Sequence, residues 1–116
     1  MTTKLYTAET IKQQISMGRT ADKKSGAFAL CCWGATQFVG QAENNNDLGN
    51  LAFKVSGKKF KGTVKVRLMF NDLYKVEFWK IRGASVQIKK SFDHIYCEDL
   101  TETIDNFVEY TKEAAA

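Results

Sequence analysis

The sequence predicts an α+β fold in two layers, in which an antiparallel four- to five-stranded meander sheet carries an N-terminal and a C-terminal helix on one face. Residues 51–90 alternate apolar and polar side chains with the period of a β-strand. Segments with the apolar spacing of an amphipathic helix precede and follow this stretch. The sheet and both helices can bury their apolar surfaces by packing against one another.

Length and composition predict a single domain over residues 1–116. The chain has 116 residues, 44% of them hydrophobic, which is enough to bury a core without disulfide or metal support. Its three cysteines are an odd number and two are adjacent, so no disulfide framework is expected. We expect reduced thiols in a cytoplasmic protein, because no secretory signal or membrane-spanning apolar segment is recognisable either.

The first predicted helix covers about residues 8–17. Thr7 has the character of an N-cap, and Ile11 and Ile15 form the buried stripe. Gly18 is a natural residue for the position after the helix end.

The next two segments are assigned by composition. Ala27–Trp33 is a short apolar run that we interpret as a mostly buried strand, although its Ala and Leu residues would also suit a helix. Residues 34–50 contain three glycines and the run Asn44–Asp47, which predicts a long surface loop.

The alternating stretch divides into four predicted strands joined by hairpins. The apolar positions that recur every second residue are Leu51, Phe53 and Val55, then Val64, Val66, Leu68 and Phe70, then Tyr74, Val76 and Phe78. A last strand is predicted at about 85–90. The turns fall at residues 56–59, 71–72 and 82–84, where Gly, Asn and Asp occur.

The C-terminal segment predicts the second helix. Leu100, Ile104, Phe107 and Val108 lie on one helical stripe. Acidic residues at its start suit the positive end of the helix dipole, and further acidic residues would make its exposed side negative.

Charge is distributed unevenly along the chain. Residues 51–90 contain eleven Lys or Arg and two acidic residues, whereas residues 91–116 contain one basic and seven acidic residues. Such a division indicates a polyanion-binding surface or an electrostatically docked partner, and net charge alone does not choose between them.

The alternation places basic and aromatic side chains together on the second face of the sheet. The predicted nucleic-acid-binding residues are Lys54, Lys61, Lys65, Arg67, Lys75, Trp79 and Lys89. Cations can bind phosphates and Trp79 can stack on an unpaired base, so we expect a non-enzymatic protein that binds single-stranded nucleic acid or RNA. Duplex DNA is less favoured because no predicted helix has a basic recognition face.

Two simpler interpretations of this face remain open. Lysines on a solvent-exposed sheet commonly prevent aggregation between strands, and Trp79 could pack under a loop or in a dimer interface.

A second functional hypothesis is a protein-interaction or inhibitory accessory protein of the kind found in phages or mobile elements, which could act as a homodimer. It would act through an exposed Trp79 patch or through the acidic C-terminal helix, whose candidate residues are Asp99, Glu102, Asp105 and Glu109.

The sequence predicts no catalytic residues, metal site or cofactor. His94 and Cys97 lack a readable orienting group, and the adjacent cysteines Cys31 and Cys32 lack the spacing of zinc ligands. Glu77 and Lys80 should point to opposite faces of a strand, which argues against a nuclease-like metal site. No sequence motif assigns the chain to a family.

Overall fold

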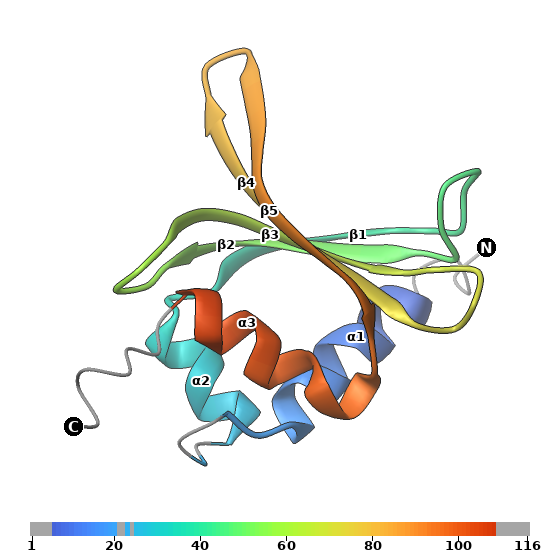
Figure 1. The fold of residues 1–116 in the computed structure, drawn as a ribbon, viewed down its shortest axis with the longest axis horizontal. Coiled ribbons are helices and arrows are strands. Elements are labelled where there is room, and N and C mark those ends of the chain that lie inside the picture. The colour runs from blue at the N-terminus through green and yellow to red at the C-terminus, as the bar shows by residue number, and fades with distance from the viewer. Residues whose placement is uncertain (1–5, 21–22, 24, 109–116) are drawn as a thin grey trace.

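A computed structural model describes residues 6–20, 23 and 25–108. Five antiparallel strands form one sheet in the order β1-β2-β3-β4-β5, with three helices on one face (Figure 1). The strands are β1 (Thr36–Gln41), β2 (Asn50–Ser56), β3 (Lys61–Leu68), β4 (Tyr74–Arg82) and β5 (Ser85–Ile95). The helices are α1 (Tyr6–Met17), α2 (Gly26–Cys32) and α3 (Leu100–Val108), the last preceded by the 3-10 turn η2 (Cys97–Asp99). The predicted α+β meander is therefore confirmed.

The core lies between the helices and the inner face of the sheet. The sheet contributes fully buried side chains such as Phe53, Val64 and Phe78, while Ile11 of α1 and Ile104 of α3 close the core from the other side. The alternation in residues 51–78 thus predicted the inner face, except at Phe70, which lies beyond the end of β3 and is 57% exposed. The opposite face, which carries no helix, is called the outer face below.

Trp33, which follows α2, contacts both the sheet and helix α3. Its side chain is fully buried and stacks on Phe53 with ring centroids 6.5 Å apart. Its Nε1 donates a hydrogen bond of 2.8 Å to Oδ1 of Asp105 on α3. This bond supplies the partner that a buried indole N–H needs and gives the carboxylate a structural role.

The predictions for residues 26–50 were wrong in two places. Ala27–Trp33 was expected to be a strand, but Gly26–Cys32 is helical, and Ser25 caps it by accepting a hydrogen bond from the Phe28 N–H. The expected loop contains β1, which supplies the fifth strand of the meander.

Smaller differences affect element ends. Helix α1 begins at Tyr6, so Thr7 lies in its first turn and donates a hydrogen bond to the Leu48 carbonyl instead of capping the helix. The helix ends at Met17, next to Gly18 as predicted. Strand β3 ends at Leu68, and strand β5 extends well beyond the predicted end at Lys90.

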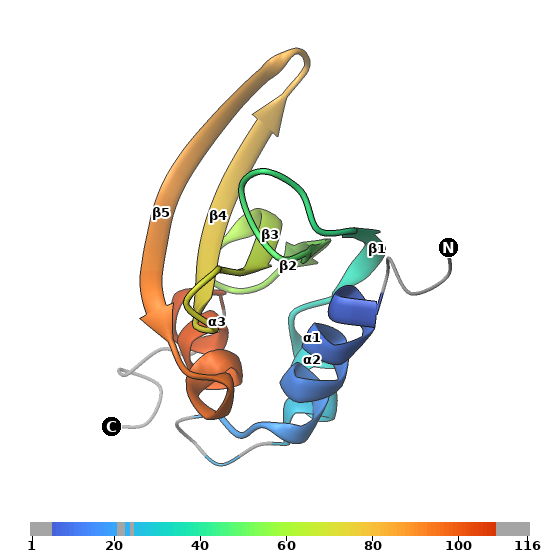
Figure 2. The same ribbon diagram turned by 90° about the vertical axis from the view of Figure 1, so that its right-hand side faces the viewer.

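The turn end of the β4–β5 hairpin extends beyond the rest of the sheet (Figures 1 and 2). Pairing between β3 and β4 reaches only to Thr63 and Trp79, whereas β4 and β5 remain paired as far as Arg82 and Ser85. We call residues 80–91 the arm, which consists of this projecting part and the adjoining stretch of β5 that pairs with Glu77, Phe78 and Trp79. All its residues from 81 onward are exposed.

No helix in the described part of the chain has the length and apolar character needed to cross a bilayer.

Candidate nucleic-acid interface

The strand register brings six of the seven predicted binding residues to the outer face. Lys54 pairs with Thr63, which pairs with Trp79, and Arg67 pairs with Lys75. Since directly paired residues point to the same side of a sheet, the alternation along β3 also places Lys61 and Lys65 there. Lys54 and Lys61 are exposed, while Lys65, Arg67, Lys75 and Trp79 are half-buried.

Lys89 is the exception. Phe78 pairs with Lys90 and Trp79 pairs with Ile88, so Lys89 is the extra residue of a β-bulge. It is exposed on the arm, but strand alternation no longer determines its direction.

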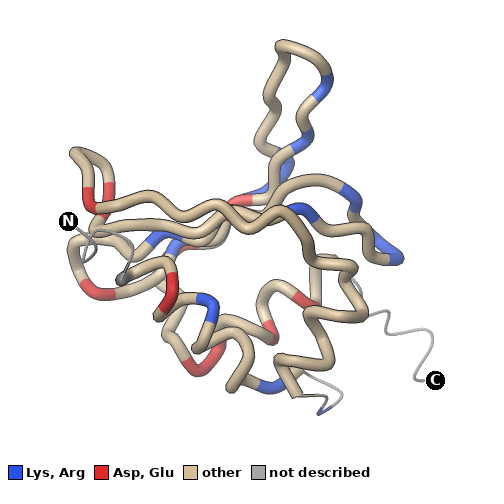
Figure 3. Tube along the Cα trace, turned by 180° about the vertical axis from the view of Figure 1, so that it is seen from behind, with Lys and Arg blue, Asp and Glu red and all other residues tan. Residues whose placement is uncertain are grey.

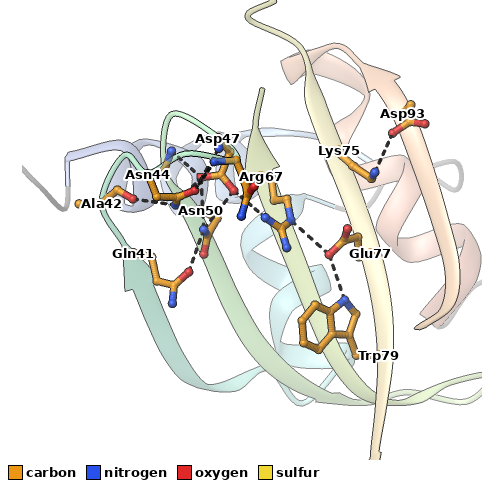
Figure 4. A network of polar contacts seen from close by, with 12 residues as sticks. Gln41, Ala42, Asn44, Asp47, Asn50, Arg67, Lys75, Glu77, Trp79 and Asp93 are labelled. Atoms are coloured by element: carbon orange, nitrogen blue, oxygen red, sulfur yellow. Dashed lines mark hydrogen bonds and ion pairs between the residues drawn. The ribbon is translucent and has the colours of Figure 1, made fainter. Parts of the chain in front are cut away.

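Arg67 is held by two carboxylates and is therefore a structural cation. Its Nη1 lies 2.8 Å from Oδ2 of Asp47, and its Nε lies 3.2 Å from Oε1 of Glu77 (Figure 4). The same Glu77 oxygen accepts a hydrogen bond of 3.0 Å from Trp79 Nε1. The network joins the 42–49 loop to β3 and β4, and the two carboxylates neutralise much of the charge that Arg67 was expected to offer a phosphate.

Lys65 lies over the Trp79 side chain of this network. Its Nζ is 5.1 Å from the centroid of a Trp79 ring, within range of a cation–π interaction. Partial burial lowers the pKa of Lys65, and the nearby Arg67 guanidinium lowers it further, whereas Glu77 and Asp47 act in the opposite direction. Lys65 therefore orients the indole ring as well as contributing charge.

The remaining cations of the outer face differ in their availability. Lys75 Nζ lies 3.7 Å from Oδ1 of Asp93, which is a solvent-exposed ion pair of small energetic weight. Lys54 and Lys61 form no ion pair within the described part of the chain. These two lysines are the most accessible cations on the body of the sheet.

The arm adds an apolar surface to the outer face, in which Val86 and Ile88 could not be placed beside Trp79 and Ile81 from the sequence alone. Ile81 pairs with Val86, and Trp79 pairs with Ile88, so these four side chains share one side of the hairpin. Ile81, Val86 and Ile88 are 50%, 53% and 52% exposed, respectively. Basic residues occupy other positions of the arm and the β2–β3 turn (Figure 3).

A pocket of about 500 Å³ opens where the 42–49 loop meets the outer face. Its lining combines two cations with four carboxamide side chains, namely Lys65, Arg67, Gln41, Asn44, Asn45 and Asn46, together with Ala42. The Asn-rich run was predicted to be a surface loop, but its position beside Lys65 depends on β1, which was not predicted.

The acidic surface proposed for the alternative function is smaller than expected. Glu98, Asp99 and Glu102 are exposed at the start of the C-terminal helical region. Asp105 is fully buried, and its hydrogen bond from Trp33 removes it from any docking surface. Glu109 lies outside the described residues.

Comparison of the chain with protein-family models, curated proteins and solved structures gives no match. Any proposal for its function therefore depends on the chemistry of the outer face.

Proposed function

We propose that the protein is a non-enzymatic binder of single-stranded nucleic acid, and that the strand lies along the outer face and the base of the arm. One observation carries this proposal. The exposed lysines Lys54 and Lys61 lie on the same side of the sheet as Trp79 and the apolar side of the arm.

This combination suits the two parts of a nucleotide. Phosphates are attracted by cations, whereas the faces of unpaired bases pack on aromatic and aliphatic side chains. Lys54 neighbours Thr63, and Thr63 neighbours Trp79, so a cation and an aromatic surface are separated by a single strand of the sheet.

A single strand fits this surface better than a duplex. Base pairing and stacking in a duplex hide the faces that would contact Trp79, Ile81 and Ile88. A duplex would use only the lysines, and the carboxylates on Arg67 already weaken that electrostatic contribution.

The test is fluorescence anisotropy with labelled 20-nucleotide single-stranded DNA and RNA at increasing salt. We expect binding at low salt that weakens steeply as salt rises, because binding releases counterions from the phosphates. The Lys54→Glu, Lys61→Glu double variant should bind at least about tenfold more weakly and should show a shallower salt dependence.

The matched control is Arg19→Glu, Lys23→Glu, which makes the same change in net charge. Both residues are exposed in the segment that joins α1 and α2, on the helical side of the molecule. This control should retain binding. Absence of binding at low salt by the folded wild-type protein, or an equal loss in both double variants, would contradict the proposal.

The exposed apolar side of the arm favours a second candidate function, which is association with another copy of this chain. Ile81, Val86 and Ile88 are each about half exposed. Packing two arms together would bury these apolar side chains away from water. Light scattering distinguishes the candidates. A dimer that becomes monomeric in Ile81→Ser, Val86→Ser and does not bind oligonucleotides would favour self-association.

A further inference from the structure

We propose that the pocket between the 42–49 loop and β3 selects the identity of one base in the bound strand. This inference rests on the proposed function and adds sequence preference to it. The pocket volume of about 500 Å³ lies within the usual range for sites that bind small organic groups.

The carboxylates beside Arg67 reduce the positive charge that the pocket offers to a phosphate. Arg67, one of the two cations in the lining, is paired with Asp47 and Glu77. A neutral heterocycle does not need the net positive charge that a phosphate site requires.

The loop that carries the carboxamides is held in one conformation by its own hydrogen bonds. The Asn44 side chain accepts from the backbone N–H groups of Asn46 and Asp47, at 2.7 and 3.1 Å. Asp47 in turn accepts from the Gly49 N–H and from Arg67, which attaches the loop to β3. A loop that is ordered before binding loses less conformational entropy on contact with a ligand.

Three carboxamides can then read the edge of a base. Asn45 and Asn46 are exposed at the rim of the pocket. Gln41 Oε1 accepts a hydrogen bond of 3.0 Å from Asn50 Nδ2, which fixes the Gln41 amide and leaves its own NH₂ group as a donor. Carboxamides pair a donor with an acceptor, and this pattern distinguishes bases by their edges.

The position of the pocket makes such a contact compatible with the proposed strand path. Lys65 contributes to the pocket lining and also lies over Trp79. A strand whose one base stacks on Trp79 can therefore place a nearby base beside Gln41 without leaving the outer face.

The experiment compares labelled 20-nucleotide homopolymers of dA, dC and dT at one salt concentration. We expect the best and worst homopolymers to differ at least about fivefold in affinity, as carboxamide recognition of a base edge normally gives. In Asn45→Ala, Asn46→Ala the preferred homopolymer should fall to the level of the others, with an unchanged salt dependence. Gln13→Ala, an exposed carboxamide on α1, is the control and should keep the preference.

The outcomes separate this inference from the function on which it rests. Equal binding of all three homopolymers, or an unchanged preference in the Asn45, Asn46 variant, overturns the base-selective pocket and leaves single-strand binding intact. If no homopolymer binds, both proposals fall. If the free nucleoside monophosphate of the preferred base displaces the oligonucleotide at equal base concentration, the pocket is a free-nucleotide site and the inference is overturned.

Discussion

Arg67 shows that a basic side chain on a sheet face can belong to the fold. Arg67 lies two residues after Lys65 on the same face of β3, and both were predicted to bind phosphate. In the structure Arg67 is paired with Asp47, which is fully buried, and with Glu77, whose side chain is 8% exposed. These carboxylates need the guanidinium as a partner, because buried charges without one are strongly unfavourable.

Arg67→Ala should therefore destabilise the protein by about 3 kcal/mol, since it leaves two largely buried carboxylates without their cation. Urea unfolding followed by Trp fluorescence or circular dichroism measures this change. Lys54→Ala is the matched control on the same face, and it should change the free energy of unfolding by less than about 0.5 kcal/mol. Similar effects of the two substitutions would mean that the Asp47–Arg67–Glu77 network contributes little to stability.

At the scale of elements, the close approach of α1 and α2 depends on Gly26. A Cβ atom at this position would lie 1.7 Å from the Ile15 carbonyl oxygen, and the Gly26 N–H donates a hydrogen bond of 2.8 Å to the Gly18 carbonyl. The obstructing atom belongs to the backbone of a packed helix, so it cannot move aside as a side chain can.

Gly26→Ala should lower the free energy of unfolding by more than about 2 kcal/mol, because α1 and α2 must separate to admit the methyl group. Thermal and urea unfolding measure the loss. Gly83→Ala is the control: nothing lies within 4 Å of its Cβ position, and its φ of 57° predicts a strain of only about 1 kcal/mol. A smaller loss at Gly26 than at Gly83 would contradict this account of the packing.

The elements also show what the sequence could predict. Strict alternation identified β2, β3 and β4, and the wide apolar stripe identified α3, because each pattern extends over many residues. Residues 27–33 have no polar positions that could separate a helical period from a strand period, so the α2 prediction failed. Strand β1 was missed because Thr36–Gln41 contains the adjacent apolar residues Phe38 and Val39 and a glycine, without an alternating pattern.

Part of the candidate site could also be predicted from the local pattern of the strands. Alternation placed Lys54, Lys65 and Trp79 on one face, since this depends only on the local period. The pairing of Arg67 with Asp47 could not be predicted, because it joins positions 20 residues apart through a loop whose path depends on β1. The apolar side of the arm required the register of β4 and β5 as well as their sequences.

At the scale of the whole molecule, the fold separates two kinds of surface. The helices cover the inner face of the sheet, and the outer face with its arm remains open on the other side (Figure 2). The exposed carboxylates Glu98, Asp99 and Glu102 lie at the start of the C-terminal helical region, whereas Lys54 and Lys61 are exposed on the outer face. This arrangement would orient an approaching polyanion toward the outer face.

The arm should be locally less stable than the rest of the sheet. Beyond Trp79 its two strands are hydrogen-bonded only to each other, without a third strand, and such isolated hairpins are marginally stable in water. Native-state hydrogen exchange should therefore show fast exchange for amides of residues 81–88 and slow exchange for those of Val66 and Val76. Equal protection of the two regions would show that the arm opens only when the whole protein unfolds. A hairpin that opens by itself could close around a bound chain, and its amides would then exchange more slowly in the complex.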